Sequence, residues 1–191
     1  MNNVEIEIQV NIENSKPLLD FLEKNAEFKA ENHQIDEYFT PEHRDFIKAK
    51  PIEEWLRLRD SAGKYSINYK KWHYAEDGKG YHADEYETKF EDLSQVKKIL
   101  EVLNFKPLVT VDKLRKTWIY KDYEIEIDSV KGLGDFVEIE YLGKEENSDP
   151  KEITAGMIKF LKGIGVGKIK RNYVGYPSQL LFPGEVKWEE Q

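Results

Sequence analysis

Carboxylate side chains that alternate with apolar residues could bind a metal ion in this protein. Glu5 and Glu7 share one face of a segment whose other face is apolar, and Glu138 and Glu140 repeat the arrangement in FVEIEY. Such alternation indicates β-strands, because successive side chains of a strand point to opposite faces. Rows of carboxylates can be simply solvated, or they can hold a hard divalent cation. The same parity groups Glu124, Glu126 and Asp128 in one row, and Glu85 with Glu87 in another.

Pairs of cationic side chains occupy other predicted strands. Arg57 and Arg59 share one face of WLRLR, Lys113 and Arg115 share one face of a later strand, and Lys70 adds a further cation. Two guanidinium groups side by side are suited to bidentate binding of phosphate oxygens. A solvated face usually mixes charges, whereas here acidic strands stay acidic and basic strands stay basic. Opposed acidic and basic faces would suit a triphosphate bound together with a divalent metal.

The strands that must position these groups are organised around residues 123–141, which read YEIEIDSVKGLGDFVEIEY. Two alternating runs flank a Gly-Leu-Gly sequence, which predicts two antiparallel strands joined by a glycine turn. The segment WHYAEDGKGYHAD, with His73 and His82, is expected to be a polar, mobile loop. Alternation predicts further strands near residues 4–10, 35–39, 55–59, 65–70, 85–90 and 111–120, and a last strand or extended segment over 169–181.

Three helices are predicted between the strands. The first covers about residues 15–25, the second begins at the cap residue Asp92, and the third begins at Asp149 and ends at Gly163 or Gly165. About eight strands and three helices favour an α+β fold. We expect a closed or nearly closed eight-stranded antiparallel β-barrel, with the charged faces inward and the helices packed outside. Residues 1–191 are expected to form a single domain.

Composition excludes several classes of function. A formal charge of −8 and a pI near 5.2 argue against non-specific binding of nucleic acid, which needs a basic surface. The chain has no cysteine, no apolar run that could span a bilayer and no signal segment, so a soluble, cytoplasmic protein without membrane contact is expected. A dinucleotide fingerprint, a P-loop, HExxH and GxSxG are all absent.

The motifs together resemble the CYTH superfamily of triphosphate tunnel enzymes, and more narrowly its class IV adenylyl cyclase branch. The resemblance covers nearly the whole chain and implies an eight-stranded antiparallel tunnel with metal-dependent chemistry on a triphosphate. The matching segments, in family order, are EIEIQ at 5–9, QIDEYF at 34–39, HRDF at 43–46, WLRLRD at 55–60, ETKFED at 87–92, VDKLR at 111–115 and IDSVKGLGDFVEIE at 127–140, followed by a tail near Tyr173.

The resemblance also implies roles for individual residues, and by analogy it allows a homodimer. Catalytic roles fall to Glu5, Glu7, Lys113 and Arg115. Phosphate binding falls to Gln9, Arg57, Arg59, Lys70, Lys113 and Arg115. Mg²⁺ or Mn²⁺ would be held by Glu5, Glu7, Glu126, Asp128, Glu138 and Glu140, and the other residues expected in the tunnel are Glu85, Glu87 and Tyr173.

Gln9 departs from the family's opening Glu-x-Glu-x-Lys, so a neutral amide stands where a lysine would bring charge. Three functions therefore remain open. A cyclase would join the ribose 3′-oxygen of ATP to the α-phosphorus and release pyrophosphate. A triphosphatase would direct water to the terminal phosphorus of an inorganic, nucleoside or thiamine triphosphate. A non-catalytic protein would only bind polyphosphate-like anions. The likeness of QIDEYF and HRDF to the cyclase branch favours the first.

Overall fold

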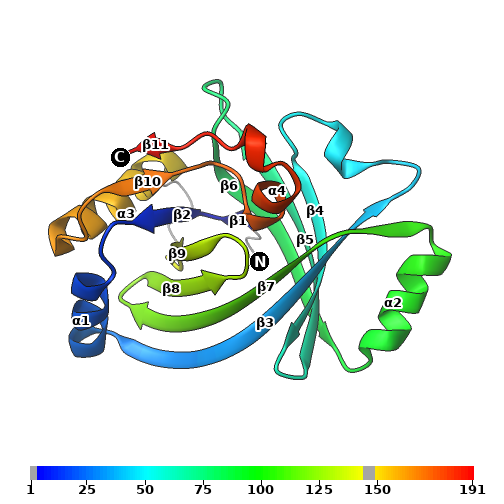
Figure 1. Cartoon of the computed structure of the whole chain (residues 1–191), viewed down its shortest axis with the longest axis horizontal. Helices are drawn as coiled ribbons and strands as arrows, with labels where there is room; N and C mark the ends of the chain where they lie inside the picture. Colours follow the sequence, from blue (N-terminus) through cyan, green and yellow to red (C-terminus); the bar gives the residue numbers. More distant parts are fainter. Residues whose placement is uncertain (1–3, 144–148) are drawn as a thin grey trace.

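A single antiparallel sheet dominates the computed structural model, which describes residues 4–143 and 149–191 (Figure 1). Within these ranges the sheet has eleven strands, accompanied by four α-helices. The strands are β1 (Val4–Glu5), β2 (Glu7–Ile12), β3 (Glu27–Pro41), β4 (Glu54–Ser61), β5 (Lys64–Tyr74), β6 (Gly80–Phe90), β7 (Phe105–Tyr120), β8 (Tyr123–Val130), β9 (Gly134–Tyr141), β10 (Ile169–Arg171) and β11 (Glu189–Glu190). The helices are α1 (Lys16–Asn25), α2 (Leu93–Val102), α3 (Pro150–Ile164) and α4 (Tyr176–Leu181), with short 3₁₀ turns at Phe46–Lys48 and Pro183–Glu185.

Neighbouring strands follow the order β1-β6-β5-β4-β3-β7-β8-β9-β2-β10-β11. The expected eight-stranded closed barrel is not confirmed, because the sheet has eleven strands in the described ranges and is open between β1 and β11. The predicted N-terminal strand divides at Ile6, so that β1 pairs with β6 whereas β2 pairs with β9 and β10. β10 takes the second edge of β2 at residues 10–12, and in the described ranges no pairing of β2 with β6 closes the ring. The sheet still curls strongly around the middle of the molecule (Figure 1).

The glycine hairpin predicted within residues 123–141 is confirmed. Strands β8 and β9 pair from Tyr123 opposite Tyr141 to Val130 opposite Gly134. Gly132 in the turn and Gly134 at its end have φ of +84° and +99°, a region that glycine enters without a Cβ clash. The register sets Glu124 opposite Glu140 and Glu126 opposite Glu138. Two rows of carboxylates therefore lie side by side on one face of the sheet.

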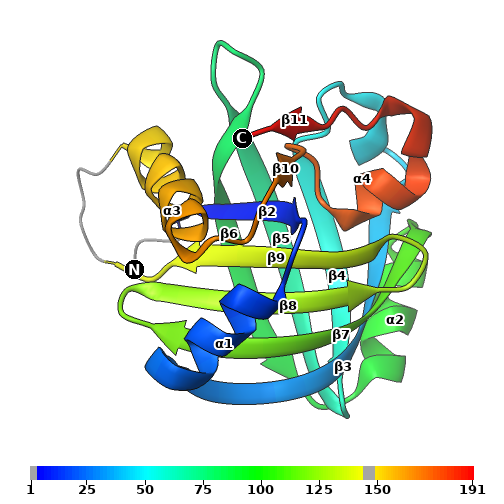
Figure 2. The ribbon, with the colours of Figure 1, turned by 60° about the vertical axis from the view of Figure 1, so that its left-hand side comes forward.

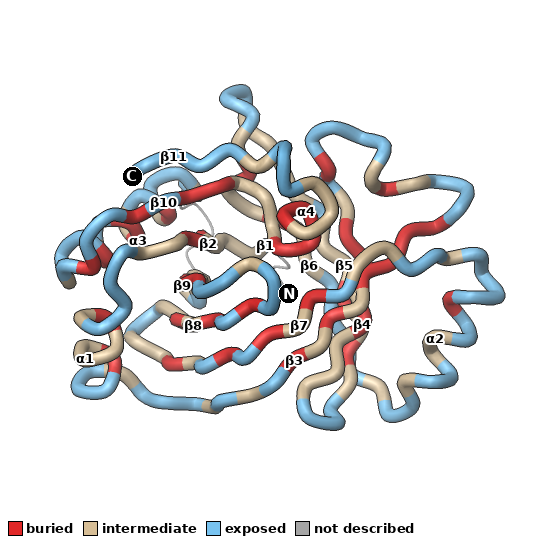
Figure 3. The backbone as a smooth tube through the Cα atoms, in the orientation of Figure 1, coloured by how far each residue is buried: buried red, intermediate tan, exposed pale blue. Residues whose placement is uncertain are grey.

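Helices α1 and α3 cover the outer face of β2, β8 and β9, and α2 stands apart near β3 and β7 (Figure 2). Full burial of one large apolar side chain contributes about 1.5–3 kcal/mol, so this outer core fixes which strand face points outward. Figure 3 shows the buried residues concentrated on the strands and on the inner sides of α1, α3 and α4. The core of this region comprises Ile8, Val10, Leu18, Leu22, Trp118, Ile125, Val137, Ile139, Met157, Ile158, Leu161, Val166 and Ile169.

The predicted helix ends are confirmed for α2 and α3. The Asp92 side chain accepts a hydrogen bond from the Gln95 amide at 3.0 Å, which satisfies one of the free amides of the first turn of α2. Asp149 caps α3 in the same way through the Lys151 amide at 2.9 Å. Of the two glycines considered, Gly165 ends α3, with a left-handed φ of +86°.

Three segments differ from the prediction. The predicted loop at WHYAEDGKGYHAD is a hairpin in which β5 and β6 continue to pair, and the stacked rings of His73 and His82 lie 4.8 Å apart. Cross-strand packing of aromatic rings outweighs the polar composition there. The tail at 169–181 is extended only in β10, since Pro177 occupies the first turn of α4, where its fixed φ suits a helix. The predicted strand at 35–39 is also longer, because β3 runs over Glu27–Pro41.

Candidate active site

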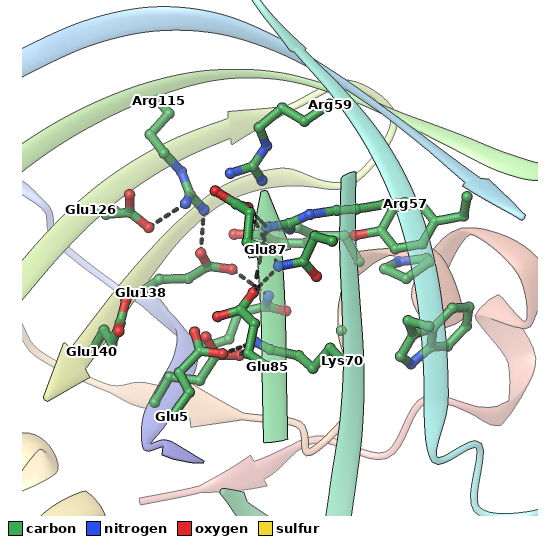
Figure 4. Close-up of a pocket in the computed structure, with 18 of the residues that line it drawn as sticks. Glu5, Arg57, Arg59, Lys70, Glu85, Glu87, Arg115, Glu126, Glu138 and Glu140 are labelled. Carbon is green, nitrogen blue, oxygen red and sulfur yellow. Dashed lines mark hydrogen bonds and ion pairs between the residues drawn. The ribbon is translucent and has the colours of Figure 1, made fainter. Parts of the chain in front are cut away.

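The inner face of the curled sheet encloses a cavity of about 290 Å³ (Figure 4). Its lining is strongly charged, with eight glutamates and five cationic side chains. Residues that are far apart in the sequence therefore meet in one cavity. The charged residues that line it are Glu5, Glu7, Glu85, Glu87, Glu124, Glu126, Glu138 and Glu140, together with Arg57, Arg59, Lys70, Lys113 and Arg115.

Strand alternation explains why these charges point inward. In β2, Ile8 and Val10 are buried in the outer core, so Glu7 and Gln9 take the opposite face and line the cavity. Ile139 of β9 is 0% exposed in the same core, and the glutamates on either side of it face inward. A slip of one residue in register would exchange the two faces, so the apolar core holds the charged groups in place.

Arg57 and Arg59 of β4 are held by a buried carboxylate on β3. Asp36 is 1% exposed and accepts two hydrogen bonds from Arg59, from Nε at 2.6 Å and from Nη2 at 2.7 Å. Nη1 of Arg57 lies 3.7 Å from the same carboxylate. Burial by itself would raise the pKa of Asp36, but the two guanidinium groups outweigh burial and lower that pKa. Asp36 thus fixes both arginines while they line the cavity.

Lys113 and Arg115 of β7 rest on a second buried carboxylate, Asp128 of β8. Asp128 is 0% exposed and accepts hydrogen bonds from Arg115 Nε at 2.7 Å, Lys113 Nζ at 3.1 Å and the Tyr176 hydroxyl at 2.9 Å. Arg115 also forms an ion pair with Glu138 on the cavity side (Figure 4). We call Arg57, Arg59, Lys113 and Arg115 the cationic wall, because each has a carboxylate partner behind it.

The opposite side of the cavity carries more carboxylates than cations. Lys70 of β5 lies 2.7 Å from Glu5 and 3.1 Å from Glu7. Glu124 and Glu140 have no ion pair with a lysine or arginine among residues 4–143 and 149–191. Burial, with the charges of Glu7 and Glu124, raises the pKa of Glu140 to about 8. We call Glu7, Glu124 and Glu140 the acidic wall, which a bound cation would neutralise.

The acidic wall has the donor chemistry that Mg²⁺ or Mn²⁺ prefers. Hard divalent cations bind carboxylate oxygens, and the wall has more negative than positive charge. In the described part of the chain no three histidine, aspartate or glutamate side chains form a ready metal cluster. Lys70 lies against Glu5 and Glu7 and would compete with a metal ion for their oxygens. Glu7 lies opposite Glu140 across β2 and β9, and both line the cavity, so the donors of this wall fit such an ion in chemistry and position.

Glu85 and Glu87 of β6 line the cavity beside Arg57. Nη2 of Arg57 lies 3.8 Å from Glu85 and 3.7 Å from Glu87, and the Asn68 amide donates hydrogen bonds to both carboxylates. Although burial opposes it, the charge of Lys70, a hydrogen bond with Glu5, and then Arg57 and Asn68 lower the pKa of Glu85 to about 2. Glu85 and Glu87 partly neutralise Arg57 on the cavity side. An anion that binds Arg57 would have to displace these carboxylates.

Two neighbours hold the amide of Gln9, the residue that stands where the family motif has lysine. Its Nε2 donates to Glu138 at 2.7 Å, and its Oε1 accepts from Gln179 Nε2 at 2.7 Å. Gln179 lies on α4 and is 3% exposed. A lysine ammonium has no acceptor, so it could not take the bond from Gln179. The glutamine at position 9 is thus matched by a partner from the tail.

An aromatic pocket of about 140 Å³ adjoins the charged cavity. Trp55, Trp72 and Gly175 line both spaces, and Tyr74 and Phe182 add two more rings to the pocket. Aromatic walls favour the stacking of a planar heterocycle. A substrate that carries such a ring beside a phosphate chain would fill both spaces.

The structure brings the predicted site residues together with two exceptions. Asp128 lies behind the cavity wall, and Tyr173 lines the aromatic pocket and an outer cleft. The sequence assignment omitted Asp36, although it shares a strand face with Tyr38 in QIDEYF. It also omitted Tyr176 on α4, where an extended tail was expected and no face could be assigned. The other omitted side chains that line the cavity are Tyr38, Trp55, Asn68, Trp72, Glu124 and Pro177.

Comparison with known families identifies the class of protein. The CYTH domain family matches residues 1–174, so the chain belongs to the CYTH domain family. That result agrees with the sheet-rich fold and with the charged cavity that the fold encloses. None of the helices in the described ranges has the length and apolar character that crossing a membrane requires.

Similar proteins are archaeal and plant members of this fold. A Methanocaldococcus jannaschii protein, provisionally named an adenylate cyclase, is 31% identical over 175 residues, which cover 90% of this chain and 97% of that protein. A Pyrococcus horikoshii protein of known structure has a TM-score of 0.74 and 28% identity, covering 93% of this chain and 98% of its own. A Hippeastrum protein, provisionally called an adenylyl cyclase and described as having a dominant triphosphatase activity, has a TM-score of 0.64 and 19% identity over 94% of this chain and 95% of its own. At that identity the likeness concerns the fold alone.

Proposed function

We propose that the cavity binds the phosphate chain of ATP with Mg²⁺ or Mn²⁺, and that the protein converts ATP to cyclic AMP and pyrophosphate. The observation that carries this proposal is the opposition of two walls across one cavity of about 290 Å³. A cationic wall is suited to phosphate oxygens, and an acidic wall is suited to a divalent metal. A triphosphate with its metal ion presents both complementary charges at once.

The cationic wall would hold the phosphates. Arginine forks bind phosphate oxygens in pairs, and lysine supplies a compact charge. Asp36 and Asp128 already fix the side chains of this wall from behind. Binding would therefore require little further ordering of these cations, which lowers its entropic cost. Arg115 would exchange its ion pair with Glu138 for one with the substrate.

Glu5, Glu7, Glu138 and Glu140 would hold the metal ion. When bound, Mg²⁺ or Mn²⁺ would act as a Lewis acid that neutralises charge on the phosphate oxygens. Glu138 and Glu140 lie on one strand with the same inward parity, and Glu7 pairs with Glu140 across β2 and β9. Lys70, once separated from Glu5 and Glu7, would become free to approach the substrate phosphates.

In the cyclase reaction a bond forms between the ribose 3′-oxygen and the α-phosphorus. The bond from the α-phosphorus to the bridging oxygen breaks, pyrophosphate leaves, and the hydroxyl proton passes to a carboxylate of the acidic wall. Lys113 and Arg115 would stabilise the charge that grows on pyrophosphate. The aromatic pocket supports a nucleotide, since Trp55 and Trp72 offer a stacking surface for adenine beside the phosphates. The name of the Methanocaldococcus relative agrees with this choice.

A triphosphatase is the second candidate, because it needs the same charged cavity. Water would bond to the terminal phosphorus, and the bond from that phosphorus to the bridging oxygen would break and release orthophosphate. The dominant triphosphatase activity described for the Hippeastrum protein supports this candidate. The two reactions differ in which phosphorus lies next to the nucleophile.

Product analysis tests the proposal. The purified protein is incubated with Mn²⁺ and either ATP or inorganic triphosphate, and the products are resolved by chromatography and phosphorus NMR. A cyclase yields cyclic AMP and pyrophosphate from ATP and does nothing to inorganic triphosphate, which has no ribose. Orthophosphate from both substrates without cyclic AMP would replace the cyclase by the triphosphatase. No product from either, with triphosphate still bound, would leave only a binding function.

A further inference from the structure

A second group of cations lies outside the charged cavity, in a cleft between α3, β6 and β10. The cleft has a volume of about 490 Å³, and no aspartate or glutamate of the described ranges lines it. A cleft in which every charged side chain of the lining is a cation is unusual in a chain whose net charge is −8. The lining consists of Lys151, Lys159, Lys162 and Arg171 with Tyr81, Thr154, Ala155, Ile158, Tyr173 and Gln191.

Arg171 at the base of this cleft is a buried cation without a carboxylate at ion-pair distance among the described residues; Glu7 acts on it only from farther away. The residue is 4% exposed, its Nε has no hydrogen-bond partner, and no acidic side chain of residues 4–143 and 149–191 forms an ion pair with it. Its guanidinium lies 4.4 Å from the ring centre of Tyr173 and 5.9 Å from that of Tyr81. Burial lowers the pKa of Arg171. A buried charge that lacks an anion is costly, so this arrangement indicates a ligand.

Three lysines on one face of α3 form the rim of the cleft. Lys151, Lys159 and Lys162 are exposed and lie at helical spacing along that face. Lys151 is 3.3 Å from Asp77, whereas Lys159 and Lys162 have no ion pair within the described residues. A cation near the C-terminus of a helix stabilises the helix dipole, which accounts for Lys162 alone. The dipole does not explain why Arg171 is buried beneath the lysines.

We propose that this cleft is a second anion site, which binds a small phosphate-type anion through the Arg171 fork at its base and through Lys159 and Lys162 at its rim. A guanidinium with a free N–H favours a tetrahedral oxyanion that can accept several hydrogen bonds. A large polyanion is disfavoured for two reasons. Arg171 is too deeply buried for a nucleic-acid backbone to reach, and the net negative charge of the protein repels nucleic acid.

Nuclear magnetic resonance can separate this site from the charged cavity. The ¹⁵N-labelled protein is titrated with pyrophosphate in the presence of a chelator, at an ionic strength held constant with KCl. Saturable shifts are expected for the amides of residues 154–162 and 169–173, with an affinity distinct from that reported by amides beside Gln9 and Glu138. The double variant K159Q/K162Q should weaken binding at the cleft by roughly tenfold or more.

A matched control removes the same charge elsewhere. Lys64 and Lys98 are exposed on the β4–β5 turn and on α2, so K64Q/K98Q should leave the affinity of the cleft unchanged. Arg171→Lys keeps the charge but removes the fork, and it should also weaken binding. The absence of saturable shifts at 154–162 and 169–173, or an equal loss of affinity in K64Q/K98Q, would overturn the proposal. If Arg171→Lys does not fold, the comparison of K159Q/K162Q with K64Q/K98Q still tests whether the cleft binds the anion.

Discussion

The two walls of the charged cavity differ in whether their charges are balanced within the protein. In the cationic wall, Asp36 and Asp128 neutralise the cations from behind, and both carboxylates are no more than 1% exposed. In the acidic wall, Glu124 and Glu140 have no cation at ion-pair distance in the described ranges. The charges of the cationic wall are therefore neutralised within the folded protein, whereas the acidic wall keeps negative charge that no neighbouring cation of the described residues neutralises.

This difference in charge balance explains how one cavity can accept both an anion and a cation. Buried ion pairs fix cations in place before the ligand arrives, so that the donors are preorganised. Burial, together with repulsion from Glu7 and Glu124, raises the pKa of Glu140 to about 8, and a bound metal ion would relieve that repulsion. Substitutions in either wall, or at the boundary between them, should therefore have effects of different kinds and sizes.

Asp128→Asn should be the most destabilising change in the cationic wall. Asp128 accepts hydrogen bonds from Lys113, Arg115 and Tyr176, so the neutral amide would remove the carboxylate that pairs with Lys113 and one of the three that pair with Arg115. Breaking a buried ion pair typically costs about 3–5 kcal/mol. Urea denaturation measures this loss. Asp112→Asn is the control, since Asp112 makes only partly exposed ion pairs, and an equal loss in both variants would contradict the special role of Asp128.

Arg57→Ala should weaken triphosphate binding with a smaller effect on folding. Each charge-assisted hydrogen bond to phosphate is worth about 1.5–3 kcal/mol, which corresponds to a loss of affinity between about tenfold and a hundredfold. Calorimetric titration with a non-hydrolysable triphosphate measures it. Arg44→Ala serves as the control, because Arg44 pairs with Glu54 outside the cavity. Unchanged affinity in Arg57→Ala would mean that the cationic wall does not bind the phosphates.

The acidic wall should make the metal-free protein less stable as the pH rises. The pKa of Glu140 is about 8 in the folded protein against an ordinary 4.5, so between these values the folded state keeps a proton that the unfolded state has lost. Stability from this group is therefore present below about pH 4.5 and falls as the pH approaches 8. Melting temperatures recorded with a chelator between pH 5 and pH 8 should show the decline.

Glu140→Gln should flatten that decline, because its amide does not titrate. Saturating Mn²⁺ should restore stability near pH 8, since the metal ion binds the deprotonated carboxylate. Glu152→Gln, a change at an exposed carboxylate on α3, should leave the slope as it is. A slope that is identical in the protein and in Glu140→Gln would show that Glu140 is not the group responsible.

Gln9→Lys should have the smallest effect, because Gln9 lies where the two walls meet. The lysine would lose the hydrogen bond from Gln179 and gain an ion pair with Glu138. Glu138 would therefore neutralise part of the added charge before a phosphate binds. Triphosphate affinity should rise by less than about 1 kcal/mol. Gln9→Met removes both hydrogen bonds without adding charge and separates the two contributions. Weaker binding in Gln9→Lys would mean that the Gln179 contact matters more than the charge.

Local patterns in the sequence predicted the parts of the fold that depend on local chemistry. The alternation around Ile139 predicted which glutamates share a face, and the Asp92 and Asp149 caps predicted where helices begin. Closure of the sheet was not predictable in this way, because it depends on which strand takes the second edge of β2, and β10 does so from the far end of the chain. The pattern of apolar and polar residues in a single strand does not show which distant strand pairs with it.

The site shows the same limit. The sequence placed Arg115 on a charged face, since parity alone decides that. It could not show that Asp128 lies buried behind Arg115 and Lys113. That burial depends on the packing of α4, whose Tyr176 hydroxyl donates to the same carboxylate. Nor could it show why Gln9 replaces a lysine, since its partner Gln179 lies 170 residues further along the chain.

The most direct test of the two-wall account is a crystal structure with Mn²⁺ and a non-hydrolysable ATP analogue, with the manganese located by anomalous diffraction. We predict a manganese peak bonded to oxygens of Glu7 and Glu140, with the phosphate oxygens within hydrogen-bond distance of Arg57 and Arg115. Manganese located away from the acidic wall, or phosphates that make no contact with the cationic wall, would contradict the account.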